Sequence, residues 1–471
     1  MNSKRIAKAG GETQGKIILF HPSSFALVFK SGIFLQHTLM SSLAEHKNTN
    51  RILILLLTSL PMVFIALYIW RFGLNIPFMD QWNVLKLLIK QEQGSLGIFD
   101  LFAQHNEHRP FFPRLIWMTL AASTRYNVNA ELWVNFLIAL GTFLFFIRQA
   151  VNTWNKAGVK WSPLLIPLFS LLVFNLGQYE SWLQGIQTIM FLGMACVVIG
   201  LFLLAEHSRN SHFAAAMLLG VVANFSMVNG LLYWPIGLGV LILTAPQDTR
   251  ILKLSIWLLC GVACSAFFLN GWITNGVDLR YGFIHLKDAF LFILNFLGAP
   301  INSLERYAWK FGVLCLGLIV LMSSHVIAVR NWKDTAPYLG IILFVLASAL
   351  LVTLGRMELG LIQSRVSRYQ TLSIWLWACL LVYFPLLDLE HFYRNLFYAA
   401  ISVALLNLMY TGYLNGQLGI YQRTLPAYQA LTSGQPVSDE NLLLLRPELD
   451  VVRSGLDFLH ENQLSFYADL P

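Results

Sequence analysis

Ionisable side chains gather in two gaps between the long apolar runs of this sequence. The later gap, residues 355–370, holds Arg356, Arg365 and Arg368. The earlier gap, residues 75–114, holds Asp80, Glu107, His108, Arg109 and Arg114. Arginine suits phosphate because its planar fork donates two parallel hydrogen bonds, and a carboxylate nearby can take a proton. Because such groups near a membrane must face water or a ligand, the two gaps predict a site for a phosphate-linked lipid at the membrane surface.

Asp80 comes shortly after the first apolar run, just before Trp82. A carboxyl at the boundary between membrane and water is partly desolvated, which raises its pKa and suits a general base. The alternative is an N-cap, in which the Asp80 side chain accepts backbone N–H groups at the start of a helix that begins near Trp82. The two roles are compatible.

The stretch 104–109 is the most polar one outside the two ends of the chain. Here Glu107 is a candidate second acid or acceptor-binding group, His108 a candidate acceptor-binding group, and Arg109 and Arg114 candidates for holding a phosphate. A second interpretation is a divalent metal bound by His105, Glu107, His108 and Asp80, although their spacing matches no zinc signature. A third is a solvated loop with internal ion pairs. We therefore expect no metal or other cofactor, with a divalent metal as the alternative.

The later gap has three arginines against a single acid, Glu358. This predicts an excess of positive charge that phosphate oxygens would balance, with Tyr369 beside it as a sugar-binding candidate. The alternative is contact between the arginines and lipid headgroups. Weaker candidates for binding a sugar, which could instead be ordinary interface residues, are Glu180, Trp182, Gln184 and Asn229.

The chain that must position these residues has 471 residues, of which 56% are apolar and 12% charged. A soluble domain averages about 25% charged residues, and apolar runs near 20 residues recur along the chain, so the composition predicts an all-α, polytopic transmembrane helical bundle. Nucleic acid is not expected as a partner despite the formal charge of +8, because Lys and Arg sit mostly in short gaps, where membrane orientation explains them. We place about eleven spans at 52–70, 131–149, 163–178, 187–205, 212–227, 230–245, 253–271, 308–328, 337–354, 371–387 and 395–413.

The distribution of Lys and Arg predicts a cytoplasmic N-terminus and puts every candidate site residue on the extracytoplasmic side. We divide the chain into a cytoplasmic or interfacial segment 1–50, a transmembrane domain 51–413 and a small extracytoplasmic helical tail 414–471. Translation from Met40 is an alternative start. Helices lying on the membrane surface are expected at 82–91 and 111–122. A further outside helix is expected at 286–297, and short tail helices at 439–443 and 447–460.

With these residues in view, the chain resembles the polytopic lipid-linked glycosyltransferases of the GT-C superfamily, and among them bacterial enzymes that modify O-antigen or lipid A. The resemblance covers roughly residues 50–415. It rests on four features. An acid, Asp80, follows the first span, and the long first outside loop carries the run Asn106-Glu107-His108-Arg109 with Pro113-Arg114. The number of spans is similar, and a late outside loop carries arginines in the pairs Gly355-Arg356 and Arg368-Tyr369. The chain differs in having one acid where some members have two, and in its short tail.

The resemblance implies an inverting sugar transfer at the bacterial inner membrane, from a polyprenyl-phosphate donor to a hydroxyl of an envelope glycan or lipid. Asp80 matches the general base, and Arg356, Arg365 and Arg368, helped by Arg109 or Arg114, would stabilise the leaving phosphate. Two alternatives stay open. One is a lipid-linked polysaccharide polymerase or ligase, and the other is a flippase or transporter of lipid-linked sugars.

Overall fold

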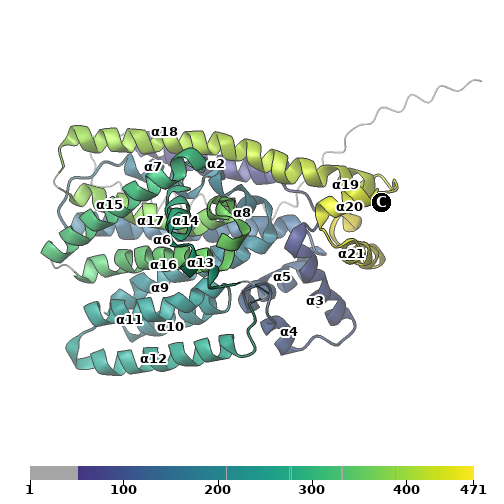
Figure 1. Ribbon diagram of the computed structural model, residues 1–471, viewed down its shortest axis with the longest axis horizontal. Coiled ribbons are helices and arrows are strands. Elements are labelled where there is room, and N and C mark those ends of the chain that lie inside the picture. The colour runs from purple at the N-terminus through teal and green to yellow at the C-terminus, as the bar shows by residue number, and fades with distance from the viewer. Residues whose placement is uncertain are drawn as a thin grey trace, which may run out of the picture. The chain divides into compact units, whose positions relative to one another are not determined.

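The computed structural model describes residues 51–207, 209–274, 276, 278–329, 332–387 and 389–470, so the predicted segment 1–50 lies outside the described residues. Within these ranges the chain is helical and forms no β-strand, in agreement with the predicted fold class (Figure 1). Among the described residues, eight helices are long and apolar enough to cross a membrane, which indicates a membrane-embedded protein. The long helices are α2 (Arg51–Phe72), α6 (Val128–Lys156), α9 (Thr188–Ala205), α12 (Gln247–Leu269), α15 (Glu305–Val329), α16 (Trp332–Arg356), α17 (Ser367–Tyr383) and α18 (His391–Gly416).

Three of the predicted spans correspond to helices shorter than a bilayer requires. They are α7 (Leu165–Val173), α10 (Asn210–Asn224) and α11 (Tyr233–Thr244). After α7 the chain turns at Asn175, whose side chain accepts the N–H of Gly177. Short helical pieces follow there and after α10, namely η2 (Leu176–Gln178), α8 (Tyr179–Leu183), η3 (Gly185–Gln187) and η4 (Val228–Leu232). Loops were expected between the predicted spans at these two places, but α7 and α10 end earlier than those spans, at Val173 and Asn224.

Helix α17 forms the centre of the protein. Nearly all its residues are buried, and it contacts α16, α9 and α14 (Leu286–Gly298). The helices farther out, such as α12 and α15, expose large apolar side chains, including Leu259 and Val320. This distribution is the one expected for helices that face lipid, because a membrane solvates apolar surface.

The long first loop contains α3 (Trp82–Glu92), α4 (Ile98–Phe102) and α5 (Phe111–Thr124). Helices are thus present where they were predicted at 82–91, 111–122 and 286–297, although the position of the first two on a membrane surface stays a prediction. Shorter pieces elsewhere are α13 (Tyr281–Ile284), η5 (Met357–Leu359), η6 (Leu361–Arg365) and η7 (Phe384–Leu386).

The tail does not begin with a break at residue 414. Helix α18 continues through a π-helical turn, η8 (Gln417–Tyr421), into α19 (Gln422–Thr432), and the whole helix His391–Thr432 has 42 residues. The expected tail helices follow as α20 (Asp439–Leu445) and α21 (Leu449–Glu461), and the short η9 (Ser465–Asp469) ends the described chain. Helix α21 packs on α3 and on α20 (Figure 1). The tail therefore packs directly against the first loop, which carries Asp80.

Candidate active site

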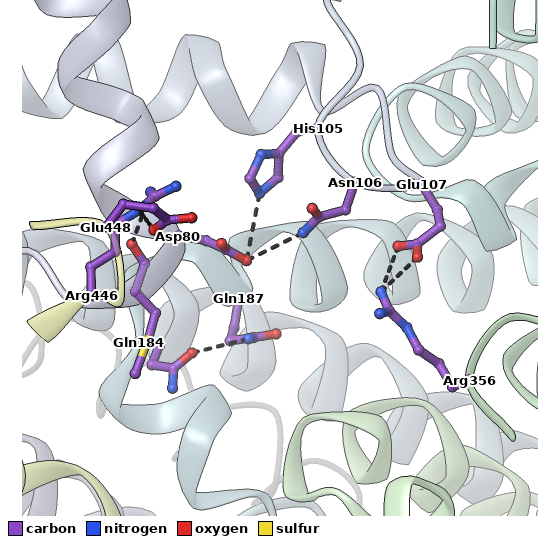
Figure 2. A network of polar contacts seen from close by, with 10 residues as sticks. Asp80, His105, Asn106, Glu107, Gln184, Gln187, Arg356, Arg446 and Glu448 are labelled. Atoms are coloured by element: carbon purple, nitrogen blue, oxygen red, sulfur yellow. Dashed lines mark hydrogen bonds and ion pairs between the residues drawn. The ribbon is translucent and has the colours of Figure 1, made fainter. Parts of the chain in front are cut away.

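A cavity of about 550 Å³ lies between the first loop, the segment around α8, the end of α16, the start of α17, and the stretch η8–α19. It brings together residues far apart in the sequence (Figure 2). The predicted site residues that line it are Asp80, Glu107, His108, Glu180, Gln184, Asn229, Arg356, Arg368 and Tyr369. The early carboxylate and two of the late arginines therefore share one cavity.

Asp80 lies in the 3-10 turn η1 (Met79–Gln81) and its side chain is 47% exposed. One oxygen, Oδ2, accepts a hydrogen bond from Asn106 Nδ2 at 3.3 Å and lies 3.7 Å from His105 Nε2. The predicted N-cap role is wrong, because α3 starts after Gln81 and no side chain caps it. Since the other oxygen, Oδ1, accepts no hydrogen bond from the described residues, it is available to a ligand.

The expected rise in the pKa of Asp80 is also wrong. The imidazole of His105 lowers the pKa of this carboxyl below its usual range and outweighs the partial desolvation, which acts the other way. The positive charges of Arg446 and Arg368 lower it further. Asp80 is consequently ionised at neutral pH and can accept a proton or a hydrogen bond from a hydroxyl group.

His105 and Asn106 reach Asp80 because residues 105–108 form a tight hairpin. The backbones of His105 and His108 exchange two hydrogen bonds, of 2.8 and 2.9 Å. Asn106, at the tip, has a φ of 49°, a left-handed conformation that asparagine tolerates better than most residues. The tip sends Asn106 towards Asp80 and Glu107 towards Arg356 (Figure 2).

His108 lines the cavity and is half-buried. Its Nδ1 accepts the backbone N–H of Val228 at 3.0 Å, and desolvation lowers its pKa to about 3. The ring is therefore neutral at physiological pH, and one of its nitrogens is already used by the backbone.

Both late arginines of the cavity are paired with carboxylates. Arg356 Nη2 lies 2.6 and 2.7 Å from the two carboxylate oxygens of Glu107. Arg368 Nη1 lies 3.6 Å from Glu180 Oε1, and the backbone N–H of Arg368 donates to Glu180 Oε2. Glu107 thus orients an arginine, and its ion pair makes it unsuited to act as a second proton acceptor.

The predicted excess of positive charge is absent from the cavity. The cavity is lined by equal numbers of acidic residues, Asp80, Glu107 and Glu180, and arginines, Arg356, Arg368 and Arg423. Arg423 comes from α19, is exposed, and forms no ion pair within the described residues.

Three predicted phosphate-binding arginines point elsewhere. The side chain of Arg109 donates to carbonyl groups of Phe102, Phe268 and Asn270. The side chain of Arg114 donates to those of Asp100, Leu101 and Ala103. Arg365 donates to the carbonyl of Ser303 and lines a separate pocket of about 230 Å³. These guanidinium groups hold loops together, because a buried carbonyl without a donor is costly.

Trp182 does not line the cavity either. Its side chain is fully buried, and its indole N–H donates to the carbonyl of Asn175 at 3.0 Å. A sugar cannot stack on a ring that is enclosed on all sides, so the predicted sugar-binding role of Trp182 is wrong.

Several lining residues were not identified as site residues from the sequence, notably Asn106, Tyr179, Gln187 and Arg423. Asn106 was detectable in principle, because it lies in the same polar stretch as Glu107. Arg423 carried no such signal, since it lies in the tail and only the fold brings it near Asp80. His105 had been considered only as a metal ligand.

Two of the four candidate metal ligands are engaged elsewhere, since Glu107 pairs with Arg356 and His108 accepts from Val228. Within the described parts of the chain, no three His, Cys, Asp or Glu side chains are placed to hold a metal ion. Comparisons of the chain with protein-family models, curated proteins and solved structures find no match. The function is consequently inferred from the geometry of the cavity.

Proposed function

We propose that this protein is an integral membrane glycosyltransferase of the GT-C type, which moves a sugar from a polyprenyl-phosphate donor to a hydroxyl of an envelope glycan or lipid. The observation that carries the proposal is that an ionised carboxylate, Asp80, and two guanidinium groups, Arg356 and Arg368, line one cavity in a membrane-embedded protein. This is the combination that the reaction needs, because one group accepts a proton and the others compensate the charge of a departing phosphate.

In the proposed reaction the acceptor oxygen attacks the anomeric carbon of the sugar on the face opposite the phosphate. The bond from that carbon to the phosphate oxygen breaks, and its electron pair leaves with polyprenyl phosphate. Asp80 takes the proton of the attacking hydroxyl, and the anomeric configuration inverts. Although the lowered pKa makes Asp80 a weak base, it suffices because the hydroxyl becomes acidic as it bonds to an oxocarbenium-like carbon.

Arg356 and Arg368 act on the leaving group. Negative charge grows on the phosphate as the bond breaks, and preorganised donors stabilise such charge most effectively where water is excluded. Glu107 and Glu180 orient the two arginines. Glu180, Gln184, Asn229 and Tyr369 line the rest of the cavity and are the candidates for holding sugar hydroxyls.

We further propose that the protein lies in the bacterial inner membrane with its N-terminus in the cytoplasm and its cavity and tail outside. The distribution of Lys and Arg between alternate loops supports this orientation. A lipid-linked donor fits the outer face, because nucleotide sugars are made in the cytoplasm and a polyprenyl phosphate can present its sugar on the far side of the membrane.

The replacement Asp80→Asn tests the proposed base. We expect transfer from a polyprenyl-phosphate sugar to envelope glycan in proteoliposomes to fall at least about 100-fold, the scale of general base catalysis. Asp100→Asn is the control, because Asp100 is a carboxylate of the same loop that pairs with Lys90 outside the cavity. Both variants should keep the thermal stability of the wild type. Retention of most activity in Asp80→Asn would remove Asp80 as the base.

The replacement Arg356→Ala tests phosphate binding. Hydrogen bonds to charged groups contribute about 1.5–3 kcal/mol, so the Kd for polyprenyl phosphate, measured by native mass spectrometry, should rise at least about tenfold. Arg453→Ala is the control, because Arg453 pairs with Asp439 outside the cavity. Glu107→Gln keeps the arginine and removes its partner. Glu107→Gln should raise the Kd less than Arg356→Ala, because the guanidinium group is still present. A wild-type Kd in Arg356→Ala would exclude direct contact between Arg356 and phosphate.

A further inference from the structure

Glu131 is a buried carboxyl that the proposed reaction does not use. It lies in the first turn of α6, is 1% exposed and does not line the cavity. Within the described residues its side chain makes one hydrogen bond, in which Gln81 Nε2 donates to Glu131 Oε2 at 3.1 Å. A buried carboxyl group is costly to place in a protein interior unless something compensates it, so its single partner calls for an explanation.

That partner belongs to the turn that carries Asp80. Gln81 is 1% exposed, and its Oε1 accepts the backbone N–H of Phe78 at 3.2 Å. This bond fixes the orientation of the amide group and turns Nε2 towards Glu131. The carbonyl of Gln81 accepts the hydroxyl of Tyr126 at 3.2 Å. Gln81 therefore closes the turn on one side and is tied to α6 on the other.

The turn needs such support because its backbone is strained. Met79 has a φ of 49°, a left-handed conformation that costs a residue other than glycine about 1 kcal/mol or more and persists only where neighbours hold it. Asp80 is the next residue. Any relaxation of Met79 would thus move the carboxylate relative to His105 and Asn106.

The same pair also lies against the backbone of η3. A Cβ atom at Gly185 would lie 1.9 Å from Glu131 Oε2 and 2.7 Å from Gln81 Nε2, so the Gly185 backbone lies directly against the pair. Gln184 and Gln187, on either side of this glycine, line the cavity. Glu131 is thus the point where the Asp80 turn and the start of α9 meet.

We propose that Glu131 is a positioning residue that, through Gln81, fixes the Met79–Gln81 turn and thereby the place of the Asp80 carboxylate in the cavity. The catalytic consequence rests on the proposed function, whereas the effect on the turn does not. Glu131 contacts no substrate; it acts through a hydrogen bond that its side chain provides as an acceptor.

Two variants remove this bond at nearly constant volume. Glu131→Leu deletes the acceptor, and Gln81→Met deletes both polar groups of the amide in case the first variant folds poorly. The control is Thr142→Val, because Thr142 is also buried in α6 but its hydroxyl bonds only within the helix, to the carbonyl of Ile138. Hydrogen–deuterium exchange of the full chain in detergent, followed by mass spectrometry, reports on the Phe78–Gln81 backbone without any need for activity.

We expect faster exchange over the Phe78–Gln81 segment in both test variants, unchanged exchange in α6 and α17, and no change in Thr142→Val. In the transfer assay kcat should fall about 10- to 100-fold, the effect of displacing a reacting group by about 1 Å, while the KM for the donor stays unchanged. Glu131→Gln, which still offers an oxygen acceptor, should retain activity within about threefold of the wild type.

The outcomes separate the two proposals. Unchanged exchange over the turn in both test variants would overturn the positioning role, and so would loss of activity in Glu131→Gln, which would indicate a role for the charge or proton of Glu131. Faster exchange combined with a wild type that transfers no sugar would support the positioning of the turn and overturn the proposed function. Equal changes in kcat and KM with a general loss of thermal stability would also overturn the positioning role, because they would show that Glu131 only stabilises the fold.

Discussion

At the scale of single residues, the central finding is that Asp80 is kept ionised rather than poised near neutrality. Its pKa is lowered chiefly by His105. A general base works in its ionised form, so the sign of the pH dependence follows directly. Transfer should persist as the pH falls below neutrality and decline only as the pH approaches this lowered pKa.

The replacement His105→Ala should shift the acidic limb of the pH profile of kcat/KM towards higher pH. It removes the largest influence that lowers the pKa of Asp80, and desolvation, which raises it, remains. His285→Ala is the control, because His285 is exposed and lies outside the cavity. An acidic limb at the same pH in both variants would show that another group controls it.

Residue types alone separated cavity residues from structural ones only in part. Asp80 and Arg356 were predicted because ionisable groups beside apolar runs are costly without a ligand or a partner. Arg109 and Arg114 gave the same signal, yet they donate to backbone carbonyls. Whether an arginine lines the cavity or donates to backbone carbonyls depends on where distant carbonyl groups lie. Only the folded chain shows this.

At the scale of elements, the hairpin 105–108 lines the cavity, and the helix pair α3–α21 joins the tail to the first loop. Helix positions in the first loop and the tail followed from apolar periodicity and proline position, whereas the hairpin did not. The hairpin has only Asn106 and Glu107 between the paired residues His105 and His108, which is too short for a periodic sequence pattern. The loops after α7 and α10 were expected, but the two helices end at Val173 and Asn224, earlier than the predicted spans, because a capping side chain such as Asn175 is a single local signal.

The contact between α21 and α3 gives a prediction at this scale. A Cβ atom at Gly455 would lie 2.8 Å from ring atoms of Trp82, so Gly455→Val overpacks the contact and should destabilise it by about 1–3 kcal/mol. A lower Tm and faster proteolysis of the tail would report this loss. Ser454→Ala is the control, because Ser454 is exposed on the same helix. Equal proteolysis of the two variants would mean that α21 is held mainly by other contacts.

At the scale of the whole molecule, the fold class followed from composition, but the role of the tail did not. The helix His391–Thr432 has 42 residues, which at about 1.5 Å per residue exceeds the roughly 30 Å of a hydrocarbon core. Its far part contains the π-helical turn Gln417–Tyr421, where Gly419 and Ile420 line the cavity. A hydropathy pattern ends where the apolar residues end, so it could not predict that one helix is long enough to cross a membrane and also lines the cavity.

The equal numbers of acidic and basic groups around the cavity have a consequence for how substrates arrive. Opposite charges so close together largely cancel beyond a Debye length, about 8 Å at physiological ionic strength. Long-range steering would then add little to the encounter rate, and a donor held in the bilayer does not need it, because lateral diffusion brings it to the entrance. The KM for the donor should accordingly change little when salt is added to the transfer assay, and a steep salt dependence would indicate capture of a water-borne anion instead.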